Sequence, residues 1–404
     1  MRIAEIVKEA LEQTEVTDMH THLFPGEFND LCLTGMDELL TFHYLIAETF
    51  LWLEEDYDSF FQRPKSEQAD LVWKTLFVDR TPTSEAAVGV LTVLQSLNIS
   101  FDHDLNVIRS RLSQMEGSDY VQAMMKRAGV SAVVMTNNPF DPQERRHYEK
   151  ETPFNRDQFI PALRVDPLLN GWENARTIIN EDGYQVSEEL TEHTLEQTKA
   201  FLRHWVKKMD PIYVAASLPW DFPRDKNESA LLEKCVLPVC EETGLSLSLM
   251  IGPKRALNPD LHLAGDGVGI FDLSYIEYLC KTYPQQKFLI TMLSREGQYE
   301  LTVLAQKFRN VMLFGCWWFL NTPQLITEIT TMRFDQLGMK FIPQHSDCRV
   351  MEQLLYKWKH SREVIAEILV ERYQTLEDKG LVIEKDTIHR DIDLMFNVNF
   401  RNFT

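Results

Sequence analysis

Hydrophobic residues follow two alternating patterns along most of the chain. Eight short stretches are rich in β-branched and aliphatic residues, and between them lie segments in which hydrophobic residues recur every three to four positions. The first pattern is typical of buried strands and the second of amphipathic helices. We predict strands at 16–22, 131–136, 159–165, 212–217, 245–251, 287–292, 310–315 and 340–345, with helices between them at 188–208, 231–243, 275–282, 299–308 and 322–337.

Strands that alternate with helices pair in parallel through right-handed crossovers. Eight such units are the number in a (β/α)8 barrel. A doubly wound open sheet is the alternative, but the sequence contains no Gly-x-Gly-x-x-Gly or Walker loop to favour it. We therefore predict an α/β fold, a (β/α)8 TIM barrel that forms a single domain over residues 1–404. Further helices are expected at 1–15 and 350–379, and the hydrophobic tail 392–400 is expected to dock on the barrel.

The region 26–125, directly after the first strand, lacks strand patterns. Its hydrophobic spacing predicts helices at 36–53, 66–77, 86–97 and 104–115. A helical insertion at this position would lie over the carboxyl ends of the strands, where barrels carry their catalytic groups. We therefore predict that 26–125 is a large helical cap insertion of the barrel.

The charge and the cysteines limit the classes of partner. A formal net charge of −20 argues against binding to nucleic acid or to an anionic membrane, and a negatively charged substrate would need local positive charge at its site. The six cysteines show no CxxC or CxxH spacing, and no hydrophobic run approaches transmembrane length. We expect a soluble cytoplasmic protein, and barrels of this size commonly form homo-oligomers.

A candidate metal site is found at the end of the first predicted strand. His20 and His22 alternate with Thr21, so both imidazoles should lie on one face, with Asp18 further down the same face. Asp347 follows the eighth strand, which neighbours the first when a barrel closes. These three residues could hold one divalent metal ion and leave positions open for water or substrate. His345 is a weaker candidate ligand. Two nitrogens and a carboxylate suit Zn²⁺, and Mn²⁺, Fe²⁺ and Co²⁺ remain possible.

The strand containing His20 and His22 resembles the first strand of the amidohydrolase superfamily of metal-dependent barrels. More closely, the chain resembles the uronate (glucuronate) isomerase family as a divergent member. The resemblance is carried by 18–23, by 40–46 with its His-Tyr pair, by 134–139, by 161–166, by 310–319 with its Trp-Trp-Phe, and by 346–349 with its Asp-Cys-Arg. Met250 and the pair Asn137 and Asn138 depart from the family's pattern.

This resemblance implies a metal-dependent aldose–ketose isomerase that acts on hexuronates, such as glucuronate with fructuronate or galacturonate with tagaturonate. It implies that Asp347 moves the proton and also binds the metal, and that Arg349 stabilises the enediolate. His43 and Tyr44 would act from the cap as a proton-donating pair.

The same resemblance and their positions at strand ends make Arg164 and Arg255 candidates to grip the substrate carboxylate. Trp317 and Trp318 would form a wall of the sugar site. Each assignment has an alternative: the aromatic residues could be ordinary core, and Arg164 could simply pair with Asp166.

Two other functions are compatible with the sequence. A metal-dependent hydrolase of a lactone, ester or amide could use the same metal ligands, with Asp347 activating a water molecule. A barrel retained only to bind a sugar acid would need no catalytic carboxylate.

Overall fold

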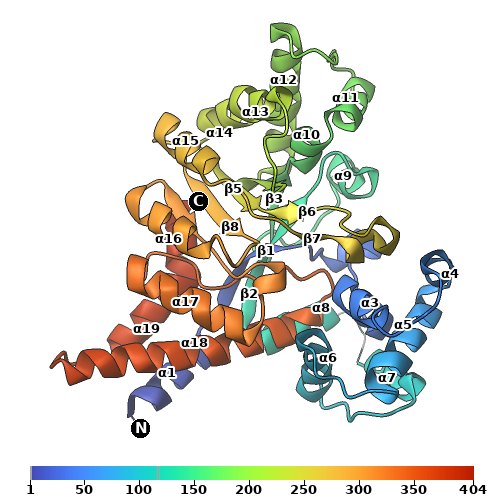
Figure 1. The fold of residues 1–404 in the computed structure, drawn as a ribbon, viewed down its shortest axis with the longest axis vertical. Coiled ribbons are helices and arrows are strands. Elements are labelled where there is room, and N and C mark those ends of the chain that lie inside the picture. Colours follow the sequence, from blue (N-terminus) through green and yellow to red (C-terminus); the bar gives the residue numbers. More distant parts are fainter. Residues whose placement is uncertain (1, 116, 118) are drawn as a thin grey trace.

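The computed structural model describes residues 2–115, 117 and 119–404. Residues 116 and 118, within the predicted insertion 26–125, and residue 1 lie outside the described residues. A curled, parallel seven-stranded sheet forms the centre of the molecule (Figure 1). Its strands, in spatial order, are β1 (Val16–Thr21), β2 (Val130–Asn137), β3 (Phe159–Arg164), β4 (Tyr213–Leu218), β5 (Ser246–Ile251), β8 (Phe288–Met292) and β9 (Val311–Leu313). Each coincides with a predicted strand to within two residues at either end, and the α/β barrel prediction is confirmed.

The eighth predicted strand, 340–345, forms only a single parallel bridge, between Ile342 and Phe314. The amide of Gly315 donates to the Ile342 carbonyl at 2.8 Å, and the amide of Asp347 donates to the His20 carbonyl at 3.1 Å. Pro343 has no N–H to continue a ladder, which limits regular pairing here. The segment therefore joins β9 to β1 and closes the barrel without being a regular strand.

Hydrophobic residues lie on both faces of the curled sheet. Inside it, every strand contributes to one cluster that includes Met19, Val134, Ala162 and Tyr213. A larger cluster fills the space between the outer face and the helices. Strands buried on both sides are expected to be mainly hydrophobic, which holds for β4, β8 and β9, whereas β1 carries the polar residues Asp18 and His20.

The helices that cover the barrel include those predicted from the periodicity and others, at 142–149, 166–170, 172–181, 226–231 and 385–393, that were not predicted. They are α1 (Arg2–Gln13), α9 (Pro142–Glu149), α10 (Asp166–Asn170), α11 (Trp172–Glu181), α12 (Glu192–Met209), α13 (Lys226–Leu231), α14 (Leu237–Thr243), α15 (Ser274–Thr282), α16 (Gln298–Lys307), α17 (Pro323–Leu337), α18 (Gln353–Asp378), α19 (Lys385–Asp393) and α20 (Asn399–Phe403). Helix α12 begins four residues later than predicted because the Thr191 side chain caps it by accepting from the Thr194 amide. None of the helices in the described part of the chain combines the length and hydrophobicity of a membrane span.

Between β1 and β2 the described residues form a series of short helices. These are η1 (Gly26–Leu31), α2 (Met36–Leu40), α3 (His43–Thr49), α4 (Tyr57–Phe61), α5 (Lys65–Trp73) with its π-helical continuation η2 (Lys74–Val78), α6 (Glu85–Ser96), α7 (Leu105–Ser113) and α8 (Tyr120–Ala128). The helix predicted at 36–53 is two helices, because Phe42 has extended backbone (φ −68°, ψ 142°). Helices α3–α7 lie together at the lower right of Figure 1, beside the barrel.

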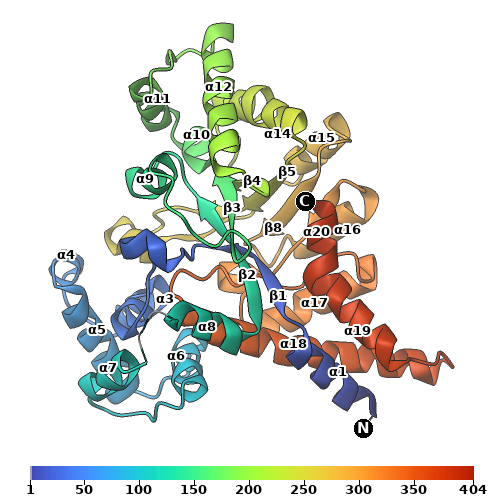
Figure 2. The same cartoon turned by 180° about the vertical axis from the view of Figure 1, so that it is seen from behind.

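The C-terminal tail lies across the amino ends of the strands, next to α1 (Figure 2). Asn397 accepts a hydrogen bond from the Thr17 amide at 3.1 Å, and the Ser246 hydroxyl donates to the Phe403 carbonyl at 2.8 Å. The carboxyl ends of the strands lie on the opposite side of the barrel. There a small hairpin of β6 (Pro253–Lys254) and β7 (Gly267–Val268), too short to produce a periodic signal in the sequence, is inserted after β5.

Candidate functional site

One pocket at the carboxyl ends of the strands brings most of the predicted residues together. Its polar and aromatic lining consists of His20, His22, His43, Thr136, Arg164, Asp166, Ser217, Arg255, Trp317, Trp318, Asp347 and Arg349. These residues come from the ends of β1, β2, β3 and β4, the first residues of α10 and α3, the loops that follow β6 and β9, and the segment that closes the barrel. Tyr44 and His345 are the predicted residues that do not line it.

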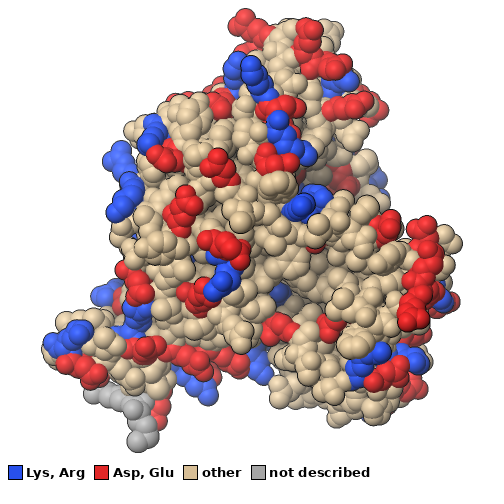
Figure 3. Space-filling model, in the orientation of Figure 1, with Lys and Arg blue, Asp and Glu red and all other residues tan. Residues whose placement is uncertain are grey.

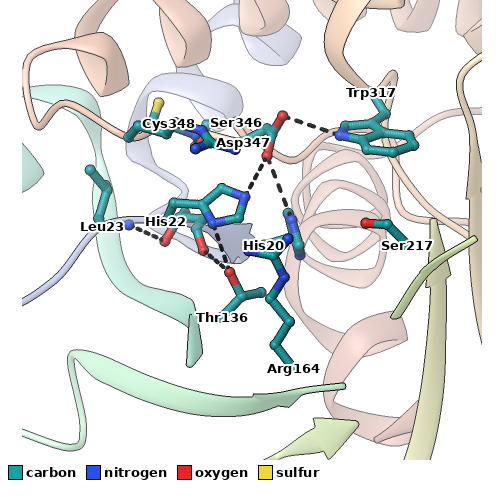
Figure 4. Close-up of polar contacts among 12 residues, drawn as sticks. His20, His22, Leu23, Thr136, Arg164, Ser217, Trp317, Ser346, Asp347 and Cys348 are labelled. Carbon is teal, nitrogen blue, oxygen red and sulfur yellow. Dashed lines mark hydrogen bonds and ion pairs between the residues drawn. The ribbon is translucent and has the colours of Figure 1, made fainter. Parts of the chain in front are cut away.

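Among the described residues, His20, His22 and Asp347 form a group whose ligand atoms lie within 4.8 Å of one another. Oδ1 of Asp347 is 3.6 Å from Nε2 of His20 and 3.4 Å from Nε2 of His22 (Figure 4). Two ligands of a tetrahedral ion, each at ~2.1 Å, are separated by ~3.4 Å. The spacing therefore fits a single metal ion held between the three side chains.

Thr136, at the end of β2, determines which nitrogen of His22 carries the proton. The Thr136 hydroxyl donates to the Thr21 carbonyl at 3.1 Å, and its oxygen is 3.0 Å from Nδ1 of His22. With its proton donated to Thr21, the hydroxyl oxygen is placed to accept from Nδ1 of His22, the tautomer that leaves a lone pair on Nε2. Burial, aided by the charge of Arg349, lowers the pKa of His22 to about 3, so the ring is neutral at neutral pH. This is the state in which a histidine binds a metal, with its other nitrogen fixed by a hydrogen bond.

Asp347 is held in a conformation that directs its carboxylate at the histidines. Its φ is +53°, in the left-handed region that Asp tolerates better than most residues. Oδ2 accepts a hydrogen bond from the Trp317 indole at 3.1 Å, while Oδ1 faces the two imidazoles. Burial alone would raise the pKa of Asp347, but its contacts with His20 and His22 hold that pKa well below the ordinary value. A carboxylate oxygen thus faces the lone pair of His22, an arrangement that a cation between them would stabilise.

Asp18 does not share the orientation of the histidines, contrary to the prediction. The pairing of β1 with β2 shifts register between Asp18 and Thr21, which breaks the alternation of faces. The buried Asp18 carboxylate accepts hydrogen bonds from the Ser346 amide at 3.0 Å and from the Trp358 indole of α18 at 2.8 Å. It therefore ties β1 to the closing segment and to α18.

His345 lies beside the metal site, below the pocket. Its ring is 5.6 Å from that of His20 between centroids, and among the described residues both of its nitrogens are buried without a hydrogen-bond partner. Its Nδ1 lies so close to Gly315 (φ +58°) that a Cβ at this glycine would come within 1.8 Å of it. Glycine is thus required at position 315 for two reasons: its φ is positive, and a side chain there would collide with the His345 ring.

Three arginines line the pocket, and two of them already have carboxylate partners. Nε of Arg164 donates to Asp166 at 2.8 Å, and Arg255 is paired with Asp266. Among the described residues, Arg349 has no ion pair. The pairing of Arg164 with Asp166 foreseen as an alternative does form, yet Arg164 also faces the pocket. The pocket therefore gathers three guanidinium groups, of which only that of Arg349 has no ion-pair partner among the described residues.

His43 and Tyr44 begin α3 at the side of the pocket. Among the described residues, neither buried nitrogen of His43 has a hydrogen-bond partner, and burial together with Arg349 lowers its pKa well below the usual value. Tyr44 lies behind His43, and the buried ammonium of Lys357 is 5.6 Å from the centroid of its ring. Lys357 in turn donates to Asn321 at 3.2 Å. His43 is thus available to a ligand, whereas Tyr44 packs between His43 and α18.

The sequence interpretation missed Thr136, Asp166 and Ser217 as pocket residues. Each lies at or just after the end of a predicted strand, and that position is the only signal that could have identified them. Asp166 accepts from the Ser217 amide at 3.1 Å, so it links β3 to β4 as well as holding Arg164. Asn137, one of the departures from the family pattern, is buried and accepts a hydrogen bond from the Tyr148 hydroxyl at 2.8 Å.

Solved structures similar to this chain match it over its full length. A uronate isomerase from Bacillus halodurans C-125 is 45% identical, with a TM-score of 0.96 over 100% of this chain and 96% of that one. A uronate isomerase from Thermotoga maritima (15% identity, TM-score 0.78, 100% and 97% covered) and a glucuronate isomerase from Caulobacter crescentus (14% identity, TM-score 0.79, 100% and 94% covered) share the fold. No protein-family model and no curated protein matches the chain.

Proposed function

The chain belongs to the uronate isomerase family, and we propose that it interconverts the aldose and ketose forms of a hexuronate, such as glucuronate with fructuronate or galacturonate with tagaturonate. The observation that carries the proposal is a single pocket in which a carboxylate beside two histidines faces three arginines. A hydrolase of a neutral ester or amide would share the metal ligands but has no need of three guanidinium groups in the same pocket.

We propose that His20, His22 and Asp347 hold one divalent metal ion, with Zn²⁺ the first candidate. Support comes from the separation of their ligand atoms and from the Nδ1–H tautomer of His22, which leaves Nε2 free to bind. When bound, such an ion polarises substrate oxygens and orients them. The donor set of two nitrogens and one carboxylate also suits Mn²⁺, Fe²⁺ or Co²⁺.

The proton transfer is assigned to Asp347. Isomerisation takes a proton from C2 of the aldose and returns one to C1, which a carboxylate within hydrogen-bond reach of both carbons can do. The low pKa of Asp347 keeps it ionised and ready to accept the proton. The Trp317 hydrogen bond holds it in one orientation, so Trp317 positions the base in addition to forming part of the wall.

The remaining residues are assigned to the reacting oxygens of the substrate and to its carboxylate. The Arg349 guanidinium can stabilise the negative charge of the enediolate. His43 is a neutral imidazole with both nitrogens available, so it can pass the hydroxyl proton between the two substrate oxygens. Tyr44 does not line the pocket and would act by keeping the His43 ring in position. Arg164 and Arg255 are proposed to bind the substrate carboxylate, with Trp318 against the sugar. A cytoplasmic location and self-association stay predictions of the sequence.

The test is proton NMR of the purified, metal-loaded protein with glucuronate or galacturonate in D2O. We expect ketose signals with at least one of the sugars, and their loss in Asp347→Asn. If metal-loaded protein forms no ketose from any hexuronate but hydrolyses a lactone or ester, the hydrolase alternative is correct. If it turns over neither class, and Asp347→Asn binds sugar acids as well as the wild type does, the barrel is a binding protein.

A further inference from the structure

A groove opens from the outer side of the pocket and is larger than one sugar requires. It shares Arg164, Arg255 and Arg349 with the pocket and continues outward between α10, the loop after β4 and the β6 strand. Its volume is about 740 Å³. In Figure 3 a basic group lies over the β6 region of Figure 1, at the edge of a hollowed part of this face. Neither the metal ligands nor the proton-transfer residues occupy this outer part.

The outer groove carries positive charge that is not neutralised by the protein. Lys254 has no carboxylate partner among the described residues, and the side chain of Arg224, which is 47% exposed, is bound to Glu228 at 3.1 Å. Asp221 is an acidic residue of the outer part. In a chain with a net charge of −20, the unpaired ammonium of Lys254, beside the arginines that the groove shares with the pocket, favours an anionic ligand.

The groove also presents an aromatic side chain in a fixed position. Trp220 is 38% exposed, yet it packs so closely on Gly269 that a Cβ at this glycine would come within 2.3 Å of the indole. The Trp220 amide donates to the Pro253 carbonyl at 3.2 Å, and Nζ of Lys254 is 5.4 Å from the centroid of the ring. An exposed indole that is held in place beside an ammonium group is suited to a ligand with both an apolar sugar face and a carboxylate.

We propose that this groove is an outer subsite for a second uronate unit, with Lys254 binding its carboxylate and Trp220 contacting its ring. The inference rests on the proposed function, because it assumes a uronate in the inner pocket. The second unit is either linked to the first through O4 or is a separate sugar molecule. In a 1,4-linked diuronide C1 and C2 of the reducing end are free, so the same proton transfer converts that end to a ketose and leaves the glycosidic bond intact.

The experiment compares digalacturonate with galacturonate in wild-type protein, in Lys254→Gln and in Trp220→Leu, by calorimetry and by NMR of the reducing end. Lys226→Gln is the matched control, because it removes the same charge from an exposed lysine of the neighbouring α13, outside the groove. For a linked unit we expect digalacturonate to bind about tenfold more tightly than galacturonate, the effect of one additional charge-assisted hydrogen bond. This advantage should be lost in Lys254→Gln and Trp220→Leu and kept in Lys226→Gln.

For a separate molecule we expect galacturonate to bind wild-type protein at two sites, the weaker of which disappears in Lys254→Gln. The proposal is overturned if galacturonate binds at one site and digalacturonate binds no more tightly, or if Lys226→Gln and Lys254→Gln have the same effect. Thermal unfolding of each variant shows whether it is folded. Conversion of galacturonate alone is measured in parallel, so a failure of the proposed isomerase activity is seen separately from a failure of the outer subsite.

Discussion

Replacing Thr136 by valine should weaken metal binding without touching a metal ligand. Valine has nearly the shape of threonine but lacks the hydroxyl that accepts from Nδ1 of His22 at 3.0 Å and donates to the Thr21 carbonyl at 3.1 Å. Thr136 is 1% exposed, so water cannot easily replace the hydroxyl. The substitution therefore leaves the His22 N–H unpaired and allows the ring to turn or to change tautomer.

The magnitude follows from the two hydrogen bonds that are lost. A buried polar group left without a partner costs about 1–3 kcal/mol, which lowers the free energy of unfolding of the metal-free protein. Loss of the hydrogen bond that orients a ligating histidine reduces metal affinity by about 10–100-fold, equivalent to about 1.4–2.7 kcal/mol. We expect both effects in Thr136→Val, because one hydroxyl serves both bonds.

The assay is competition for Zn²⁺ between the protein and a chromophoric chelator, with urea unfolding of the metal-free protein alongside. Thr136→Ser is the control, since it keeps the hydroxyl and removes only a methyl group. The reasoning is refuted if Thr136→Val and Thr136→Ser have the same Kd for Zn²⁺ within twofold. That result would mean that the tautomer of His22 is not set by residue 136.

Three further variants test the site and its surroundings. In metal-saturated Asp347→Asn, the steady-state rate of ketose formation should fall by about 10²–10⁴-fold, because the variant lacks the base, and a rate near that of the wild type would contradict the assignment. Trp317→Phe removes the indole that donates to Asp347, so the acidic limb of the kcat/KM–pH profile should move about one unit toward higher pH, and an unmoved limb would argue against this bond in the active enzyme. Burial raises the pKa of Glu144 from 4.5 to about 7, so the stability that its protonated form contributes is fully present below pH 4.5 and is lost as the pH rises through 7. The glutamine of Glu144→Gln does not titrate, so between pH 5 and pH 8 the free energy of unfolding of this variant should rise by about 1–3 kcal/mol relative to that of the wild type. Urea unfolding of both proteins across this pH range measures the difference. If the difference between them is the same at every pH, the pKa of Glu144 in the native protein is unperturbed.

The sequence by itself determined the alternation of strands and helices and pointed to the residues of the candidate metal site. Local periodicity suffices for this, because the faces of a strand or helix are set by neighbours a few residues apart. His20, His22 and Asp347 could be identified because each lies at or just after the end of a predicted element, and closure of a barrel places the first strand end beside the eighth. The break between α2 and α3 was not predicted, since the pattern of hydrophobic residues runs through it without interruption.

Tertiary structure alone decided how these side chains are held. The register shift in β1 turns Asp18 toward Trp358, which no pattern within the strand indicates. The partners of the two key ligands are distant in the sequence: Thr136 lies 114 residues from His22, and Trp317 lies 30 residues from Asp347. Such pairs arise only when strand order and register bring separate strand ends to one edge. The sequence therefore predicts candidate residues for binding and reaction, and packing decides the partners and orientation of their side chains.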